Sequence, residues 1–360
     1  WWFLPFAFFG ISLLLSISYF LEAKNDHDLG LTSEIALFLT FALGAWSVFD
    51  QKIPAISVAV IITAILSLKD ALHRWLTFLS IKEVYAGIQL LVISVVLLPL
   101  LPNQGYGPYE ALNPYWIWLM VVLISGISFL GYFAMKYLGQ RSGAFITAII
   151  GALASSTAVT ISLAKFAKKQ ASKKLMINAA LLAAVVMFVR MVIEVSIVNA
   201  ELLRYLWVPM GGMIAVLLIG VSILYFGSHS QKSKHDLNVK NPLQLATALK
   251  FGILLAVILL LSEFLSDKFG EGGIIALSII AGLADVDAIT LSLSEMAKKQ
   301  LENDLAALGI ILASVSNTLV KGGIFTFYVG WKSSYRFILI LLIAGVVGIA
   351  LGLAKLPFTI

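Results

Sequence analysis

Apolar segments of about twenty residues follow one another along almost the whole chain. A helix that spans a bilayer needs about 20 predominantly apolar residues. On that criterion the sequence predicts twelve spans. They run over residues 1–22, 30–50, 53–71, 83–101, 115–138, 142–166, 175–198, 204–227, 246–266, 270–296, 303–330 and 334–354. The predicted fold is therefore all-α, a polytopic transmembrane helical bundle.

Composition agrees with this prediction. Hydrophobic residues make up 60% of the chain and charged residues only 12%, and the mean hydropathy is +0.99. Soluble domains carry about 25% charged residues, so the lipid bilayer is the expected surrounding. Cysteine is absent, which excludes disulfides and thiolate metal sites. The net charge of +6 does not indicate nucleic acid, because basic residues of membrane proteins lie mainly in loops.

An internal repeat relates two parts of the chain. Residues 151–169 read GALASSTAVTISLAKFAKK, and residues 281–299 read AGLADVDAITLSLSEMAKK, with nine of nineteen positions identical at an offset of 130. The same offset predicts two tandem four-span repeats, 115–227 and 246–354. An even number of spans predicts the same topology in both, with a pseudo-twofold axis along the membrane normal. A re-entrant segment would invert the repeat, and the sequence leaves that alternative open.

Two aspartates interrupt the apolar run of the second repeat. Asp285 and Asp287 correspond to Ser155 and Thr157 of the first repeat. A carboxylate at the centre of a span costs about 2.5–3.5 kcal/mol, and intramembrane carboxylates are functional by default. Residues two apart point to different faces of a helix, so either both faces are buried or the helix is broken. Asp285 and Ser155 favour the break, because Asp and Ser are good N-cap residues.

Further polar groups complete a candidate ion site around the two aspartates. The oxygen ligands would come from Asp285, Asp287, Ser155, Ser156, Thr157, Thr160 and Thr290. Lys321, with Asn317 one turn before it, would gate the site or balance its charge, and its simplest partner is an aspartate of the preceding span. Arg190 and Glu194 are four apart and are expected to pair. Structural roles remain the alternative, with hydroxyls bonded to the carbonyl four residues back and carboxylates acting as caps.

The two related runs resemble signatures of a family of prokaryotic membrane proteins related to MgtC/SapB. In that family an N-terminal MgtC-like part precedes a C-terminal domain of unknown function. Residues 115–330 resemble the C-terminal domain, and residues 29–45, LGLTSEIALFLTFALGA, resemble the end of the MgtC-like part. A Gly-Leu-rich run ending in Glu-Arg-Glu is not found, so residues 1–101 are interpreted as an incomplete MgtC-like part. The resemblance implies an association with magnesium homeostasis.

The sequence predicts an integral membrane transporter or channel for a small ion, with a midplane site at the repeat interface. The ion is expected to be a cation, either Mg²⁺ or one coupled to protons. Asp285 and Asp287 would be the metal ligands, and Mg²⁺ would keep several waters because two carboxylates do not make a full cage. No cofactor is certain beyond such a hard cation, and a homo-oligomer is left open.

Two alternatives to transport remain. One is a regulatory membrane protein that binds a partner complex. The other is a Mg²⁺-dependent intramembrane enzyme acting on a lipid phosphate, although a second acidic motif is lacking. Lysines around residues 167–174 predict that this loop lies in the cytoplasm of a cell with an inner membrane, and that both termini lie there too.

Overall fold

The computed structural model describes residues 3–25, 32–48, 52–68, 80–138, 144–169, 173–225 and 245–355. Every regular element in these ranges is a helix, apart from one bridge between Tyr106 and Leu112. The chain divides into two compact units, Trp1–Val84 and Tyr85–Ile360. The first unit contains α1 (Phe3–Asn25), α2 (Thr32–Ser47) and α3 (Lys52–Ser67).

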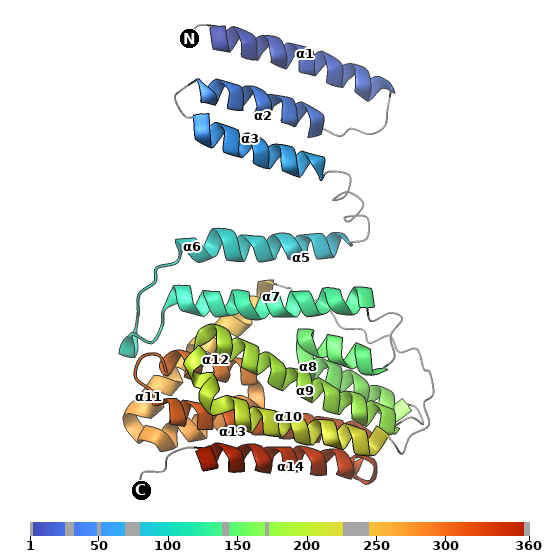
Figure 1. Ribbon diagram of the computed structural model, residues 1–360, viewed down its shortest axis with the longest axis vertical. Helices are drawn as coiled ribbons and strands as arrows, with labels where there is room; N and C mark the ends of the chain where they lie inside the picture. The colour runs from blue at the N-terminus through green and yellow to red at the C-terminus, as the bar shows by residue number, and fades with distance from the viewer. Residues whose placement is uncertain are drawn as a thin grey trace. The chain divides into compact units, whose positions relative to one another are not determined.

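The second unit is a bundle of long helices (Figure 1). The helix that enters it runs through α5 (Ile81–Leu91), the π-helical η1 (Val92–Leu97) and α6 (Leu98–Leu100). The bundle continues with α7 (Pro114–Leu138), α8 (Ala144–Lys169), α9 (Lys173–Val198), α10 (Leu203–Tyr225), α11 (Leu245–Ala284), α12 (Val286–Met296), α13 (Asn303–Val329) and α14 (Trp331–Lys355).

The prediction of an all-α, multi-pass membrane protein is confirmed. Eight helices in the described ranges are long and apolar enough to cross a membrane, and three shorter apolar helices lie in the first unit. The predicted count of twelve spans is not confirmed. Part of the difference comes from residues 246–296, where the sequence predicts two spans and the structure has one long helix bent at Gly270 (φ 57°, ψ −139°), followed by α12.

Two helices of the bundle are interrupted at equivalent positions. α8 leaves helical geometry at Ser155 (φ −165°, ψ 105°), and Asp285 (φ −154°, ψ 122°) separates α11 from α12. These are the two residues that the sequence offset pairs. Of the two alternatives that the sequence left open, a continuous helix and a broken one, the broken one is correct for both segments.

The chain turns back on itself at Asp285. Ser278 lies before the interruption and Leu293 after it, yet both face the same residue, Gly309 of α13. The last arm of α11 and the helix α12 therefore lie side by side, and α12 returns toward the side from which the arm came. Each arm is shorter than the about 20 residues that a span needs. The segment 271–296 is thus re-entrant.

The interrupted helix α8 also returns to its starting side. The ring of Trp116, at the start of α7, lies 4.3 Å from the ammonium of Lys298, which shortly precedes α13. α7 and α13 therefore begin on one side and end on the other. α8 begins just after α7 ends, and Lys165 near its C-terminal end lies 5.8 Å from the ring of Tyr328 at the end of α13. Both ends of α8 are on that second side.

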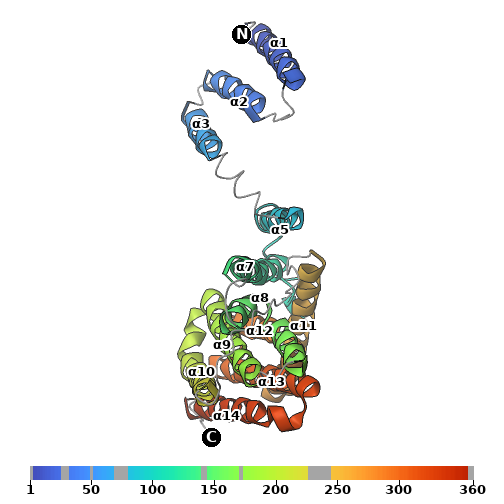
Figure 2. The same ribbon diagram turned by 90° about the vertical axis from the view of Figure 1, so that its right-hand side faces the viewer.

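Helices at corresponding positions of the two sequence repeats run in opposite directions. α10 and α14 lie side by side (Figures 1 and 2) and are antiparallel, as are α7 and α11. Three close contacts fix these directions, between Gly212 and Leu351, Gly220 and Ile340, and Val121 and Gly252. In agreement, Ser128 and Thr247 line one cavity, and Trp116 and Leu259 line another. The expectation of one shared topology is therefore wrong. A re-entrant segment makes the number of crossings odd, so the second set starts from the other side.

The same geometry corrects the predicted location of the C-terminal end. The Lys173 ammonium, at the start of α9, donates to Ser333 Oγ near the start of α14 at 3.2 Å. α14 then crosses the bundle, because Gly352 near its end lies against Pro209 in the first half of α10. The end of α14 is thus on the face opposite to the helix ends that flank residues 170–172. The two cannot both be cytoplasmic.

We predict that Gly282→Ala destabilises the protein. A methyl group at Gly282 would lie 2.5–2.9 Å from three backbone atoms of Ala313, so α11 and α13 would have to separate. Overpacking of this kind costs about 1–3 kcal/mol. Thermal unfolding in detergent measures it. Gly272→Ala is the control, because a methyl group there meets nothing within 4 Å. Equal melting temperatures for the two variants would contradict the close packing.

Candidate functional site

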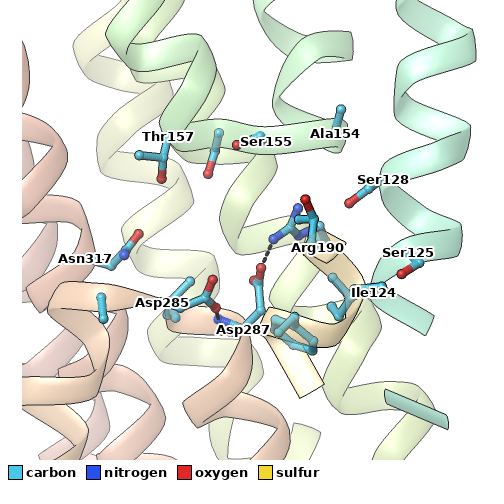
Figure 3. A pocket seen from close by; sticks show the side chains of 16 residues that line it. Ile124, Ser125, Ser128, Ala154, Ser155, Thr157, Arg190, Asp285, Asp287 and Asn317 are labelled. Carbon is cyan, nitrogen blue, oxygen red and sulfur yellow. Dashed lines mark hydrogen bonds and ion pairs between the residues drawn. The ribbon is translucent and has the colours of Figure 1, made fainter. Parts of the chain in front are cut away.

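The two interruptions meet at a polar hollow of about 180 Å³ in the middle of the bundle. Figure 3 shows Ser155 and Thr157 on one side of it and Asp285 and Asp287 on the other. The polar residues that line the hollow are Ser125, Ser128, Ser155, Ser156, Thr157, Arg190, Thr247, Asp285, Asp287 and Asn317. A cavity needs about 10–15 Å³ of such space to hold one water, so the hollow has room for several waters or for a partly hydrated ion.

Each interruption is capped by its own side chain. Asp285 Oδ1 accepts hydrogen bonds from the backbone N–H groups of Asp287 (2.9 Å) and Ala288 (3.0 Å). Ser155 Oγ accepts from the N–H of Ala158 at 3.2 Å. The free amides at a helix N-terminus attract anions when nothing else binds them. Here a carboxylate and a hydroxyl of the chain already bind amides of both first turns.

Arg190 of α9 connects the two interrupted helices. Its Nη2 donates to Asp287 Oδ2, as the dashed line in Figure 3 marks, and its Nη1 donates to the carbonyl oxygen of Leu153 at 3.3 Å. Its Nε lies 3.2 Å from Glu194 Oε1, so the expected Arg190–Glu194 ion pair is present. Arg190, Glu194 and Asp287 are all buried. Buried charges of this kind are stable only as part of such a paired group.

Lys321 does not pair with an aspartate, contrary to the prediction. Its ammonium donates to Ser156 Oγ at 2.9 Å and lies 2.6 Å from the sulfur of Met187. The ion pairs found between residues of the described ranges do not include it. The reason is that Arg190 reaches Asp287 from α9. Lys321 extends from α13 toward the interruption of α8, and it is buried there.

The remaining predicted residues fall into two groups. Asn317 lines the hollow, and its amide donates to the carbonyl of Gly282 at 2.9 Å, which holds the arm that precedes Asp285. Thr160 and Thr290 are buried but are not among the residues that line the hollow. The Thr160 hydroxyl donates to the carbonyl of Ser156, four residues back, at 2.8 Å. For Thr160 the structural alternative is therefore correct.

Sequence reasoning missed three hydroxyls of the hollow. Ser125 and Ser128 come from α7 and Thr247 from α11. The first two are three residues apart and so share one face of α7. Serine and threonine are common in membrane helices, where they bond to their own backbone. Their presence alone therefore carries no signal that they line a site.

The oxygen atoms of the hollow are of the type that hard cations bind. Asp287 Oδ1 is buried and has no hydrogen-bond partner in the structure. In the described part of the chain, however, no group of three or more His, Asp or Glu residues is placed to hold a metal ion. A hard cation in the hollow would therefore keep several of its water ligands.

Comparison with known proteins identifies the family. Residues 122–329, more than half of the chain, match a domain of unknown function, DUF4010, and residues 6–75 match the MgtC family. The chain belongs to the DUF4010 family. An uncharacterized protein of Aquifex aeolicus is 35% identical over 192 residues, which are 52% of this chain and 83% of that protein. No solved structure matches. The DUF4010 match contains both interruptions, Arg190 and Lys321.

In this DUF4010 protein we predict a large coupling between Arg190 and Asp287. Removing one partner of a buried ion pair costs about 3–5 kcal/mol, because the other charge is left uncompensated. Arg190→Gln and Asp287→Asn should each lower the free energy of unfolding by that order, and the double variant by less than the sum. A double-mutant cycle followed by thermal unfolding measures the difference.

The exposed pair Lys268–Asp267, 3.5 Å apart, is the control for that cycle. Exposed pairs contribute only about 0–1 kcal/mol, so its two single substitutions should be nearly additive. Additivity at Arg190 and Asp287 as well would contradict the view that their contact holds the two interrupted helices together.

Proposed function

We propose that this protein transports a small cation across the membrane, and that the cation binds in the hollow between the two interrupted helices. The observation that carries the proposal is Asp287. It lines the hollow, it is buried, and its Oδ1 has no hydrogen-bond partner. An ionisable residue within a membrane is costly, and such residues mark ion pathways. An unpartnered carboxylate oxygen at that depth needs a positive ligand or water.

The charges around the hollow favour a cation over an anion. Asp285, Asp287 and Glu194 carry three negative charges when ionised, while Arg190 and Lys321 carry two positive ones, so the group has a formal charge of 2 − 3 = −1. A monovalent cation makes this group neutral, and an anion would face three carboxylates. The side chains of Asp285 and Ser155 accept hydrogen bonds from the amides of the following helix turns. Those amides are therefore not free to attract an anion.

Arg190 supplies a mechanism of exchange. It donates to Asp287 and also pairs with Glu194, so it keeps a buried partner when a cation takes its place on Asp287. Release of Asp287 then leaves no charge uncompensated, which is the costly outcome. Lys321, held at Ser156 on the other side of the hollow, adds a positive charge that opposes the binding of a second cation.

An inverted duplication fits alternating access to this site. We propose that α7–α10 and α11–α14 are duplicated units related by a pseudo-twofold axis in the membrane plane. α9 and α13 begin at residues 173 and 303, an offset of 130, and corresponding helices are antiparallel. Contacts between the units come in matching pairs, α8 with α13 and α9 with α12. Secondary transporters place their sites near the midplane at such repeat interfaces, between discontinuous helices.

Flux through purified protein in vesicles tests the proposal. Vesicles with dyes for Mg²⁺, protons or monovalent cations should report flux of one cation, and Asp287→Asn should lower it about tenfold or more, as follows from a loss of about 1.4 kcal/mol of ion binding. Asp285→Asn tests charge alone, because Asn caps a helix as well as Asp does. Lys321→Met should tighten cation binding, because it removes a competing charge.

Glu271→Gln is the matched control for this experiment, since Glu271 is an exposed carboxylate away from the hollow. It should leave flux unchanged. Flux that survives Asp287→Asn, selectivity for anions, or no flux of any ion from well-folded protein would each overturn the proposal.

The distribution of charge also gives an orientation. On the face where α8 ends and α9 begins, the described helix ends of α7–α14 carry Lys and Arg and no acidic residue. Acidic residues gather on the other face. They are Glu110, Glu201, Glu263, Asp267, Glu271, Glu295, Glu302 and Asp304. Cytoplasmic loops are enriched in Lys and Arg, so we propose that the lysine-rich face is cytoplasmic.

Single cysteines test this orientation, because the chain has none of its own. A membrane-impermeant maleimide added to intact cells should label Glu302→Cys and should label Lys168→Cys only after permeabilisation. Both positions are exposed helix-end residues. The reverse pattern would invert the orientation, and equal labelling of both in intact cells would contradict the assignment of the two to opposite faces.

A further inference from the structure

A seam of buried polar groups leads from the hollow toward the acidic face, between α9 and α12. Two contacts place these helices side by side and in the same direction. Arg190 donates to Asp287 at the hollow, and Asn199 donates to the carbonyl of Ser294 at 3.4 Å about two turns further on. The stretch from residue 190 to 199 therefore runs along α12 from the hollow to its C-terminal end.

The polar groups along this seam lack partners. Thr290 and Ser294 follow Asp287 at three and seven residues, so all three share one face of α12. The hydroxyls of Thr290 and Ser294 are fully buried and have no hydrogen-bond partner in the structure. Glu194, also fully buried, has only its ion pair with Arg190. Each unsatisfied buried group costs about 1–3 kcal/mol, and water between the two helices would remove that cost.

The seam ends at a second cavity of about 280 Å³ on the acidic face. Glu295, the residue after Ser294, lines this cavity together with Glu263 and Glu110. Glu295 is only 8% exposed and pairs with two lysines, since the Lys299 ammonium lies 3.4 Å from its Oε1 and the Lys298 ammonium 3.7 Å from its Oε2. The three carboxylates of this cavity, set against these two lysines, leave a formal charge of 2 − 3 = −1 at the mouth of the seam, which attracts cations and repels anions.

The equivalent stretch of α8 has none of these features. At an offset of 130, Thr290, Ser294 and Glu295 correspond to Thr160, Ala164 and Lys165. The Thr160 hydroxyl is bonded to its own helix, alanine has no hydroxyl, and the lysine ammonium lies against the ring of Tyr328. The seam therefore belongs to one half of the bundle and leads to one face.

We infer that the seam between α9 and α12 is a hydrated access path for cations, from a mouth at Glu295 and Glu263 to the hollow at Asp287. Glu194, Thr290 and Ser294 line the path. This inference rests on the proposed transport function and adds the face from which the cation reaches the site, together with the residues that select it.

Thiol accessibility tests the inference, since single cysteines can be placed in this cysteine-free chain. Ser294→Cys and Thr290→Cys change little in size, and Ala164→Cys is the control at the equivalent position of α8. Membrane vesicles are treated with small methanethiosulfonates of similar size, one carrying a quaternary ammonium and one a sulfonate. Modification is read as a mass shift. At position 290 the smaller Ag⁺ ion is used as well, and its binding is read as protection of the thiol from modification.

Ser294→Cys should react about tenfold faster with the cationic reagent than with the anionic one, a ratio that corresponds to about 1.4 kcal/mol. Adding Glu295→Gln to that variant should lower the ratio toward one. Ala164→Cys should remain unmodified over the same time. No reaction at either seam position in folded protein, equal rates for both charges, or equal reaction of Ala164→Cys would each overturn the inference.

This readout does not depend on flux, so the two proposals fail separately. If the thiols in the seam do not react but Asp287→Asn abolishes flux, the transport proposal stands and the access path is wrong. A hydrated, cation-selective seam without flux of any ion would overturn transport, and with it the role of the seam as a conduction path.

Discussion

The second unit depends on one constraint: a backbone group within a bilayer must find its hydrogen bond inside the protein. Two helices are interrupted at that depth, and each interruption frees carbonyl and amide groups. Ser155 and Asp285 bind the amides. Arg190 binds the carbonyl of Leu153 on one interrupted helix and the carboxylate of Asp287 on the other. A single guanidinium thus connects both interrupted helices, while the carbonyl of Gly282 on α11 accepts from the Asn317 amide.

The same arrangement explains why charge is tolerated at the centre of the bundle. Arg190 has two carboxylate partners, so neither its own charge nor that of Asp287 is isolated. A structural ion pair would need only one of them. With Lys321 counted, these two carboxylates are balanced, and it is Asp285 that gives the group its formal charge of 2 − 3 = −1 when all five side chains are ionised. In the proposed function a transported cation balances that charge. In the proposed function, the stability of the bundle and the binding of the cation therefore depend on the same side chains.

Local signals were sufficient for part of this picture. Hydropathy predicted the all-α membrane bundle, and the capping preference of Asp and Ser favoured the broken helix over the continuous one at both interruptions. The direction of the chain after each interruption could not be predicted from the sequence. An apolar segment of 26 residues has the same composition whether it crosses the membrane or turns back within it. The direction is fixed by the packing of both arms, through Ser278 and Leu293, against Gly309. One re-entrant segment then reverses the direction of every later helix. The partner of Asp287 was missed for a similar reason, since Arg190 is 97 residues away and meets it only through the packing of α9 on α12.

The two interrupted helices differ in their hydrogen bonding, and under the transport proposal this difference bears on how a transporter avoids becoming a channel. Around α8 the polar groups are satisfied by the protein, with Ser156 bound by Lys321 and Thr160 by its own helix. Around α12, the hydroxyls of Thr290 and Ser294 have no partner in the structure, and in the inferred access path water satisfies them. Under the transport proposal, opening of the hollow along α8 toward the lysine-rich face would require Lys321 to leave Ser156, to which it is bonded. A lysine that leaves its hydroxyl needs a new partner, and the carboxylates across the hollow become available to it only when they have released their cation. Loss of the cation and opening of the second face are then linked through one ammonium group.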